Sequence, residues 1–247
     1  MKIALILSGG TGTRLGGAIP KQYIKVGGKP VLLYSLATLA AHPAIDVLWI
    51  VAAYEWQGAI VDWIHDAMGA EDGNGERDFA GGWQKFRGFS LPGINRQLSI
   101  LNGLEEIRKF ASGDDYVLVH DGARPMVSAS LVTEVFNAAE GHDGTIPVLP
   151  VKDTLYFSGE GKQITSLLDR SSIYAGQAPE VFRLGKYYEA NRRLLPEEIM
   201  KINGSTEPAV MAGMDMVMIP GEEGNFKITT EADLEKFQEI VVRRYGT

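Results

Sequence analysis

Short runs of apolar residues alternate along the chain with longer segments in which apolar residues recur every three or four positions. Residues 3–7 are apolar throughout, which is typical of a central strand buried on both faces of a parallel sheet. Similar runs predict strands over 47–53 and 116–119, with weaker candidates over 145–151 and 215–219. The helical spacing predicts helices over 30–41, 55–68, 97–110, 128–140, 184–194 and 231–245. This alternation indicates a three-layer α/β fold with a mostly parallel sheet.

Two segments break the alternation. Residues 69–93 are dense in glycine, which predicts a long loop. Residues 152–175 are polar and carry turn signals at Ser158–Gly161, which indicate a projecting β-arm. No segment has the composition of an inter-domain linker, so we expect a single domain over 1–247 with an arm at about 152–175.

Composition and charge exclude several classes of function. The 247 residues include no cysteine, which excludes a disulfide scaffold, a thiolate zinc site and a cysteine nucleophile. The net charge of −7 disfavours nucleic acid and anionic membranes as partners, although it allows a local basic pocket. No apolar run approaches the roughly 20 residues of a membrane span, and no targeting segment is evident. We therefore expect a cytoplasmic protein.

A glycine-rich segment, residues 8–15 (SGGTGTRL), directly follows the first predicted strand. It matches neither the Walker loop nor the GxGxxG dinucleotide fingerprint, in which a third glycine would stand at Leu15. Glycines let backbone N–H groups approach a phosphate, and Arg14 and Lys21 add two cations. The segment can hold a triphosphate and stabilise a leaving pyrophosphate, or it is a tight strand-to-helix turn with two solvated cations.

The longer motif GGTGTRLGGAIPKQY, residues 9–23, resembles the signature of the sugar-phosphate nucleotidyltransferases. Its PKQY ending is similar to that of cytidylyltransferases acting on C5 polyol phosphates, the 2-C-methyl-D-erythritol 4-phosphate and ribitol-5-phosphate enzymes. The resemblance covers about residues 2–240 and implies a Rossmann-like nucleotidyltransferase fold with CTP as a substrate. It also implies that Arg14 and Lys21 are catalytic, and that the nucleotide is contacted by Ser8, Gly9, Gly10, Gly12 and Arg14.

A second match begins at Pro92-Gly93 and continues through Asn95 to Ser99. The resemblance implies that Gly93 and Ser99 contact the nucleotide, with Ser99 near the base and ribose. Ile94 stands where the family usually has an acidic residue. Arg96 is either part of this site or an ordinary surface arginine.

The motif His120-Asp121-Gly122-Ala123-Arg124-Pro125 follows the predicted strand at 116–119. A carboxylate just past the end of such a strand lies where α/β folds bind ligands, and Mg²⁺ prefers carboxylate and phosphate oxygens. Asp121 is therefore our candidate metal ligand and substrate-binding residue, although an aspartate in this position is often only a loop cap. The motif resembles the family's HDAARP, and Arg124 is expected to face the acceptor phosphate.

Further matches extend the resemblance to the end of the chain. Thr154 would bind the acceptor phosphate, and Arg170 would reach into the site of a neighbouring subunit, which implies a homodimer. The segment 224–230 (GNFKITT) resembles the family's N-I-K-(V/I)-T and makes Lys227 the second catalytic lysine. The segment 177–180 (QAPE) departs from QTPQ, because Ala178 replaces a threonine that touches the acceptor.

Together these matches predict an enzyme that transfers CMP from CTP to a C5 polyol phosphate, with release of pyrophosphate. 2-C-Methyl-D-erythritol 4-phosphate, a precursor of isoprenoids, is the favoured acceptor. Ala178 and the wording of residues 174–177 (YAGQ) favour ribitol 5-phosphate instead, which would place the enzyme in teichoic acid or capsule synthesis. A non-catalytic nucleotide-binding module is a further alternative, but it would have no need of two lysines at the α-phosphate.

Overall fold

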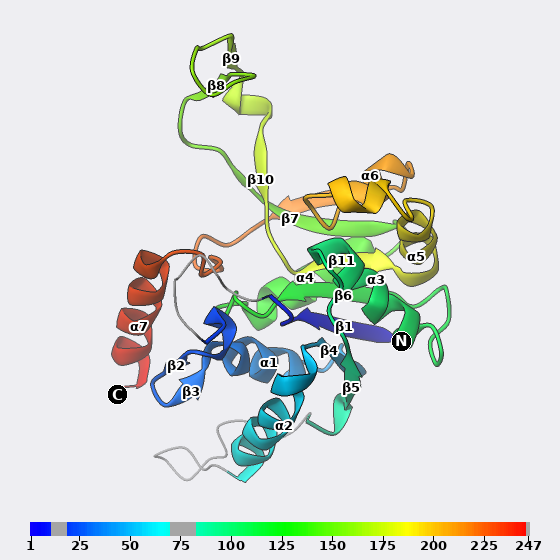
Figure 1. The fold of residues 1–247 in the computed structure, drawn as a ribbon, viewed down its shortest axis with the longest axis vertical. Helices are drawn as coiled ribbons and strands as arrows, with labels where there is room; N and C mark the ends of the chain where they lie inside the picture. Colours follow the sequence, from blue (N-terminus) through cyan, green and yellow to red (C-terminus); the bar gives the residue numbers. More distant parts are fainter. Residues whose placement is uncertain (11–18, 70–82, 246–247) are drawn as a thin grey trace.

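A computed structural model of the chain describes residues 1–10, 19–69 and 83–245. Its centre is an eight-stranded sheet (Figure 1). Seven strands follow the order β10-β7-β11-β6-β1-β4-β5, and the eighth strand, β12, pairs with β7 off this path. The strands of this sheet are β1 (Lys2–Leu7), β4 (Val47–Val51), β5 (Phe86–Ser90), β6 (Tyr116–Asp121), β7 (Gly144–Pro150), β10 (Tyr174–Gly176), β11 (Glu180–Arg183) and β12 (Met216–Pro220). Only β10 and β11 run against the others, so the expected mostly parallel sheet is confirmed.

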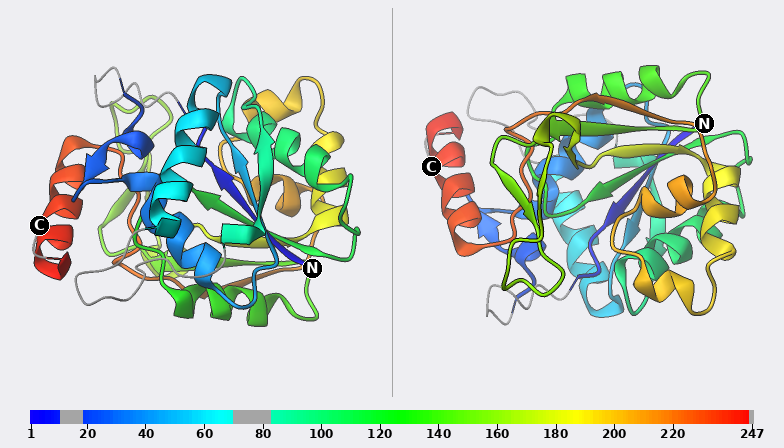
Figure 2. Two further views of the ribbon diagram at one scale, coloured as in Figure 1. Left: turned by 90° about the horizontal axis from the view of Figure 1, so that it is seen from below. Right: turned by 90° about the horizontal axis from the view of Figure 1, so that it is seen from above.

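Helices cover both faces of the sheet, as the two views of Figure 2 show. The helices are α1 (Val31–Ala41), α2 (Tyr54–Gly69), α3 (Arg96–Ile107), α4 (Ala129–Ala139), α5 (Leu184–Arg192), α6 (Glu207–Met211) and α7 (Glu231–Tyr245). Ala4 and Ile6 of β1 pack with α1, α2 and α4, whereas Ile3 and Leu5 pack with α3, α5 and α6. Both faces of β1 are thus buried, which explains its unbroken apolar run.

The predicted loop over 69–93 is wrong for its last part. Phe86–Ser90 is β5, a strand parallel to β4 at the edge of the sheet, preceded by a short 3-10 helix, η3 (Trp83–Lys85). The glycine that indicated a loop lies at a register shift, where a Cβ on Gly88 would lie 3.1 Å from the Trp49 ring. Gly88 therefore accommodates a bulky neighbour within a strand. Residues 70–82 lie outside the described part of the chain.

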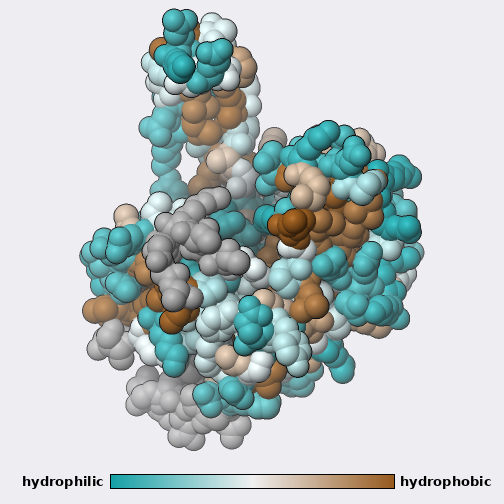
Figure 3. Space-filling view, viewed as in Figure 1, coloured by the Kyte–Doolittle hydropathy of each residue, from teal (hydrophilic) through white to brown (hydrophobic). Residues whose placement is uncertain are grey.

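The arm predicted over 152–175 is present. Two short antiparallel strands, β8 (Leu155–Phe157) and β9 (Ser166–Leu168), form a hairpin that projects away from the sheet (Figure 1). The 3-10 helix η4 (Arg170–Ser172) and β10 return the chain to β7. The hydropathy colouring of Figure 3 shows apolar surface on this arm, and its exposed apolar side chains include Tyr156, Phe157, Ile164 and Leu167.

A smaller layer lies beside the main sheet. The 3-10 helix η2 (Lys21–Tyr23) leads into the hairpin of β2 (Lys25–Val26) and β3 (Lys29–Pro30), against which α7 packs through Phe237 and Val241. The predicted helix begins at Pro30, whereas α1 begins one residue later, at Val31. Pro30 ends β3 and is the N-cap of α1. Between β11 and β12 lie α6 and the 3-10 helix η5 (Glu198–Lys201). No helix within the described residues is long and apolar enough to cross a membrane.

Candidate active site

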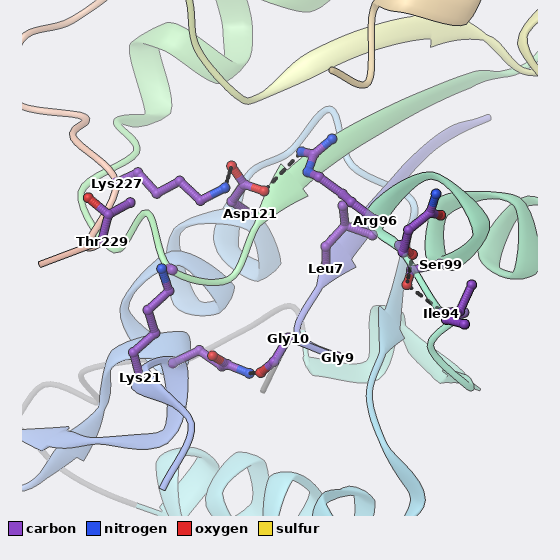
Figure 4. A pocket seen from close by; sticks show the side chains of 14 residues that line it. Leu7, Gly9, Gly10, Lys21, Ile94, Arg96, Ser99, Asp121, Lys227 and Thr229 are labelled. Carbon is purple, nitrogen blue, oxygen red and sulfur yellow. Dashed lines mark hydrogen bonds and ion pairs between the residues drawn. The ribbon is translucent and has the colours of Figure 1, made fainter. Parts of the chain in front are cut away.

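A pocket of about 570 Å³ lies where β1 and β6 end (Figure 4). Because these strands are parallel neighbours, their carboxyl ends meet at the same edge of the sheet, which is the usual ligand site of open α/β folds. Five segments supply the walls: the end of β1, the start of η2, the start of α3, the end of β6 and the residues before α7. The lining residues are Leu7, Gly9, Gly10, Lys21, Gln22, Gly93, Ile94, Asn95, Arg96, Ser99, Asp121, Ala123, Lys227 and Thr229.

The beginning of the glycine-rich segment is held by the residues of η2. The Gln22 amide donates to the carbonyl oxygens of Ser8 and Gly10, both at 2.7 Å. The Tyr23 hydroxyl donates to the Ser8 carbonyl at 2.7 Å and accepts from the Ser8 hydroxyl at 3.0 Å. Ser8 is buried and does not line the pocket, so its predicted nucleotide contact stays a prediction, whereas Gly9 and Gly10 line the pocket. The PKQY ending of the motif has a physical role here that sequence reasoning missed.

The start of α3 forms the opposite wall. The Asn95 side chain caps the helix by accepting from the Leu98 N–H at 2.8 Å. The Ser99 hydroxyl donates to the Asn95 carbonyl at 2.8 Å and accepts from the Gly93 N–H at 3.0 Å. A Cβ on Gly93 would lie 2.3 Å from the Leu98 side chain, so only glycine fits there. Gly93 and Ser99 both line the pocket, as their predicted nucleotide contact requires.

Asp121 is the centre of the charges in the pocket. One carboxylate oxygen lies 2.9 Å from the Arg96 guanidinium, and the other lies 3.0 Å from Lys227 Nζ and 3.4 Å from Arg124 Nε. Burial alone would raise the pKa of Asp121, but Arg96, then Lys227 and Arg124, hold it well below its usual range. The carboxylate is therefore ionised and compensated by three cations from separate parts of the chain.

Arg96 belongs to this site and is not an ordinary surface arginine. Although burial disfavours its charged form, the carboxylates of Asp121 and Glu180 raise the pKa of Arg96 above its usual value. The guanidinium is thus charged and oriented by its bond to Asp121. Nothing local in the sequence distinguishes the two interpretations, because its partner lies 25 residues further along the chain.

Arg124 is placed behind the pocket and is not one of its lining residues. It donates to the Asn225 carbonyl at 2.7 Å, while its own carbonyl accepts from the His120 ring at 3.0 Å. Burial lowers the pKa of His120 to about 4, so the ring is neutral and acts as a donor. In this chain Arg124 therefore ties Asp121 to the segment that carries Lys227, and its predicted contact with the acceptor phosphate stays a prediction.

The Lys227 segment is fixed by buried amides. The Asn225 side chain donates to the Ala178 carbonyl at 2.7 Å, and Gln177 bonds both the N–H and the carbonyl of Glu222 at 3.0 Å. The Ile228 N–H donates to the Ala123 carbonyl at 2.9 Å. Lys227 therefore reaches the same carboxylate as Arg96, and Lys21 enters the pocket from η2 (Figure 4).

Two predicted residues lie away from the pocket. Thr154 and Arg170 are exposed at the base of the arm, where Arg170 donates to the Lys152 carbonyl at 2.6 Å. Neither lines the pocket of its own chain. Gly12 and Arg14 lie outside the described residues, so their predicted roles stay predictions.

The donor set of the pocket is compatible with one kind of metal site. Among the described residues, no group of three or more His, Cys, Asp or Glu side chains could hold a metal on its own. Mg²⁺ is commonly held by one carboxylate together with substrate phosphates. Asp121 supplies one such carboxylate on the pocket wall, so the residues fit a magnesium ion that enters with a nucleotide.

Comparison with known proteins agrees with this geometry. The model of the 2-C-methyl-D-erythritol 4-phosphate cytidylyltransferase family matches residues 2–243. A protein of that name from Xylella fastidiosa is 33% identical over 249 residues, covering 98% of this chain and 97% of the relative. The bifunctional enzyme IspD/IspF of Rhodospirillum rubrum is 35% identical over 96% of this chain, which spans only 56% of that longer protein.

A solved structure shares both sequence and fold. The 2-C-methyl-D-erythritol 4-phosphate cytidylyltransferase of Francisella tularensis is 25% identical, with a TM-score of 0.74, and the match covers 96% of this chain and 99% of that one. The structure of 4-diphosphocytidyl-2C-methyl-D-erythritol synthase from Anaerococcus prevotii matches with a TM-score of 0.77 at 24% identity. The match covers 98% of this chain and 96% of that one, which shows a common fold.

Proposed function

Because the chain belongs to the 2-C-methyl-D-erythritol 4-phosphate cytidylyltransferase family, we propose that it transfers CMP from CTP to that acceptor. The observation that carries the proposal is one pocket at the ends of β1 and β6, in which Lys227 and Arg96 contact Asp121 and which Lys21 also lines. A site that brings an anionic acceptor to a triphosphate needs such a concentration of positive charge.

The reaction is limited by charge and by geometry. A phosphate oxygen of the acceptor attacks the α-phosphorus of CTP, and pyrophosphate leaves on the opposite side. The acceptor is already an anion near neutral pH, so no strong base is needed, and catalysis depends on positioning and electrostatic stabilisation. Lys21 and Lys227 lie on different walls of the pocket and would neutralise the α-phosphate from two sides. Arg14 would hold the β- and γ-phosphates.

The metal is part of the proposal. Mg²⁺ is commonly held by one carboxylate together with substrate phosphates, and we assign it to Asp121, which lines the pocket. When bound, the ion would neutralise phosphate charge that the lysines do not reach. Lys227 and Arg96 keep the carboxylate ionised and oriented for this role.

The acceptor is tested by measuring pyrophosphate release with Mg²⁺ and CTP. We expect release with 2-C-methyl-D-erythritol 4-phosphate and none with ribitol 5-phosphate. Release only with ribitol 5-phosphate would assign the enzyme to the alternative reaction. CTP binding without pyrophosphate release in the presence of either acceptor would favour a non-catalytic module.

The arm supports a homodimer. Its hairpin exposes Tyr156, Phe157, Ile164 and Leu167, and a second copy would bury this apolar surface. Thr154 and Arg170 lie on the same arm, away from the pocket of their own chain, which agrees with a role in the neighbouring site. Light scattering of an active preparation is expected to give twice the mass of the chain. A monomeric mass would refute the dimer.

A further inference from the structure

An aromatic cluster lies directly beneath the start of the nucleotide-binding loop, defined here as Ser8–Gly10. The Tyr23 ring is almost fully buried and stacks on Trp56 of α2, with 4.3 Å between ring centroids and 27° between planes. Trp63, two turns further along α2, meets Tyr23 at 5.8 Å and Trp56 at 6.4 Å, in tilted arrangements. Both indoles thus contact the ring of the tyrosine whose hydroxyl bonds the Ser8 carbonyl.

Within the described part of the chain, a small set of further contacts fixes the conformation of this loop. The Ser8 N–H is bonded to the Val51 carbonyl at 2.8 Å, and the carbonyls of Ser8 and Gly10 are bonded by Gln22 and Tyr23. A Cβ on Gly9 would lie 2.4 Å from Pro92, so the backbone passes close to the segment before α3. A swing of the whole Tyr23 side chain about χ1 would move its hydroxyl away from Ser8 and release one of these anchors.

We infer that Trp56 is a positioning residue for the nucleotide, acting through the Tyr23 ring on the backbone of Ser8–Gly10. Neither Trp56 nor Tyr23 lines the pocket. Gly9 and Gly10, whose backbone Tyr23 helps to hold, do line it. The inference rests on the proposed function, because it assigns the pocket to a nucleotide. It adds a residue of α2, an element that contributes no lining side chain.

The test measures CTP affinity without the acceptor, by calorimetry of the whole chain, together with the melting temperature. Trp56→Leu removes the stacked ring, and Trp56→Phe keeps an aromatic face. Trp49→Leu is the matched control, since it removes an equal volume from an indole that packs on Phe110 on the other side of the sheet. A stacked aromatic pair accounts for roughly a two- to tenfold change in an equilibrium constant.

We expect Trp56→Leu to weaken CTP binding about fivefold, Trp56→Phe to stay within about twofold, and Trp49→Leu to lower the melting temperature alone. The double variant Trp56→Leu/Tyr23→Phe should bind no more weakly than Tyr23→Phe, because both changes release the same anchor.

Different failures have different meanings. If Trp56→Leu melts earlier but binds CTP as the wild type does, the indole only stabilises the fold and the inference is wrong. If the wild-type chain binds no CTP, the proposed function fails and the inference with it. Should Trp56→Leu not fold, Tyr23→Phe carries the test, since it deletes one oxygen and leaves the ring stack in place. Unchanged CTP affinity in that variant would equally overturn the inference.

Discussion

Replacing Asp121 by asparagine keeps the shape of the side chain and removes its charge. Arg96, Lys227 and Arg124 would then lose the carboxylate that lies 2.9, 3.0 and 3.4 Å from them. At an effective dielectric constant of about 20, each of the two closer pairs has an attraction of about 5–6 kcal/mol before desolvation. The net loss on removing one partner of a buried pair is smaller, about 3–5 kcal/mol.

The surroundings of Asp121 place the expected loss at the lower end of this range. The Lys227 side chain is 34% exposed and can turn to water, and Arg124 keeps the Asn225 carbonyl. We therefore expect the free energy of unfolding to fall by about 3 kcal/mol at pH 7, and the melting temperature by about 6–12 °C. Pyrophosphate release should fall by about 10²–10³-fold, because a preorganised charge is lost.

Thermal and urea unfolding at several pH values tests this reasoning. The folded-state pKa of Asp121 lies well below its ordinary value, so its stabilisation is present above the unfolded pKa of about 4 and is lost as pH falls through the folded pKa. The difference between Asp121→Asn and the wild type should thus narrow in acid. Asp66→Asn, an exposed change on α2, is the control and should shift stability by less than about 0.5 kcal/mol. An Asp121→Asn chain as stable as this control at pH 7 would refute the charge cluster.

Three further predictions concern other residues of the site and the arm. Lys21→Met should lower turnover by about 10²–10³-fold with an unchanged melting temperature, and near-normal pyrophosphate release would remove Lys21 from the mechanism. Burial lowers the pKa of His120 from 6.5 to about 4, so its contribution to stability is present above pH 6.5 and falls between 6.5 and 4. Between pH 7 and 5 the loss should be about 2 kcal/mol in urea unfolding of the wild type, and His120→Asn should show a shallower pH dependence. Mixed dimers of Arg170→Ala and Lys227→Met chains should regain activity that neither variant has alone, which a site contained within one chain would not allow.

The sequence predicted those parts of the fold in which the pattern is local. The apolar runs at 3–7 and 116–119 are strands because both of their faces are buried, and the α-helices other than α6 follow from their spacing. β5 and β11 were missed for physical reasons: Gly88 serves the packing of Trp49, and Glu180–Arg183 is too short to show a period.

The candidate site was likewise predictable only where the pattern is local. The glycines and Asp121 lie directly after strands, so their place was predictable from neighbouring residues. The partners of Asp121 were not, because Arg96 precedes it by 25 residues and Lys227 follows it by 106. The bond from Arg124 to the carbonyl of Asn225, 101 residues later, was not predictable either, and its expected contact with the acceptor phosphate stays a prediction. Such pairings depend on tertiary structure, which no local pattern encodes.

The charge cluster around Asp121 also has a consequence for how the protein is made. During translation, Lys227 is synthesised well after Arg96, Asp121 and Arg124. It is held in place by Asn225 and Ile228 on the segment before α7. A chain shortened to about residue 220 would still contain the strands of the sheet up to β12, yet its pocket would lack one of the two lysines. The pocket is therefore completed only after the segment before α7 has been made, later than the strands of the described sheet. A chain that lacked this segment would keep most of the fold without the finished pocket.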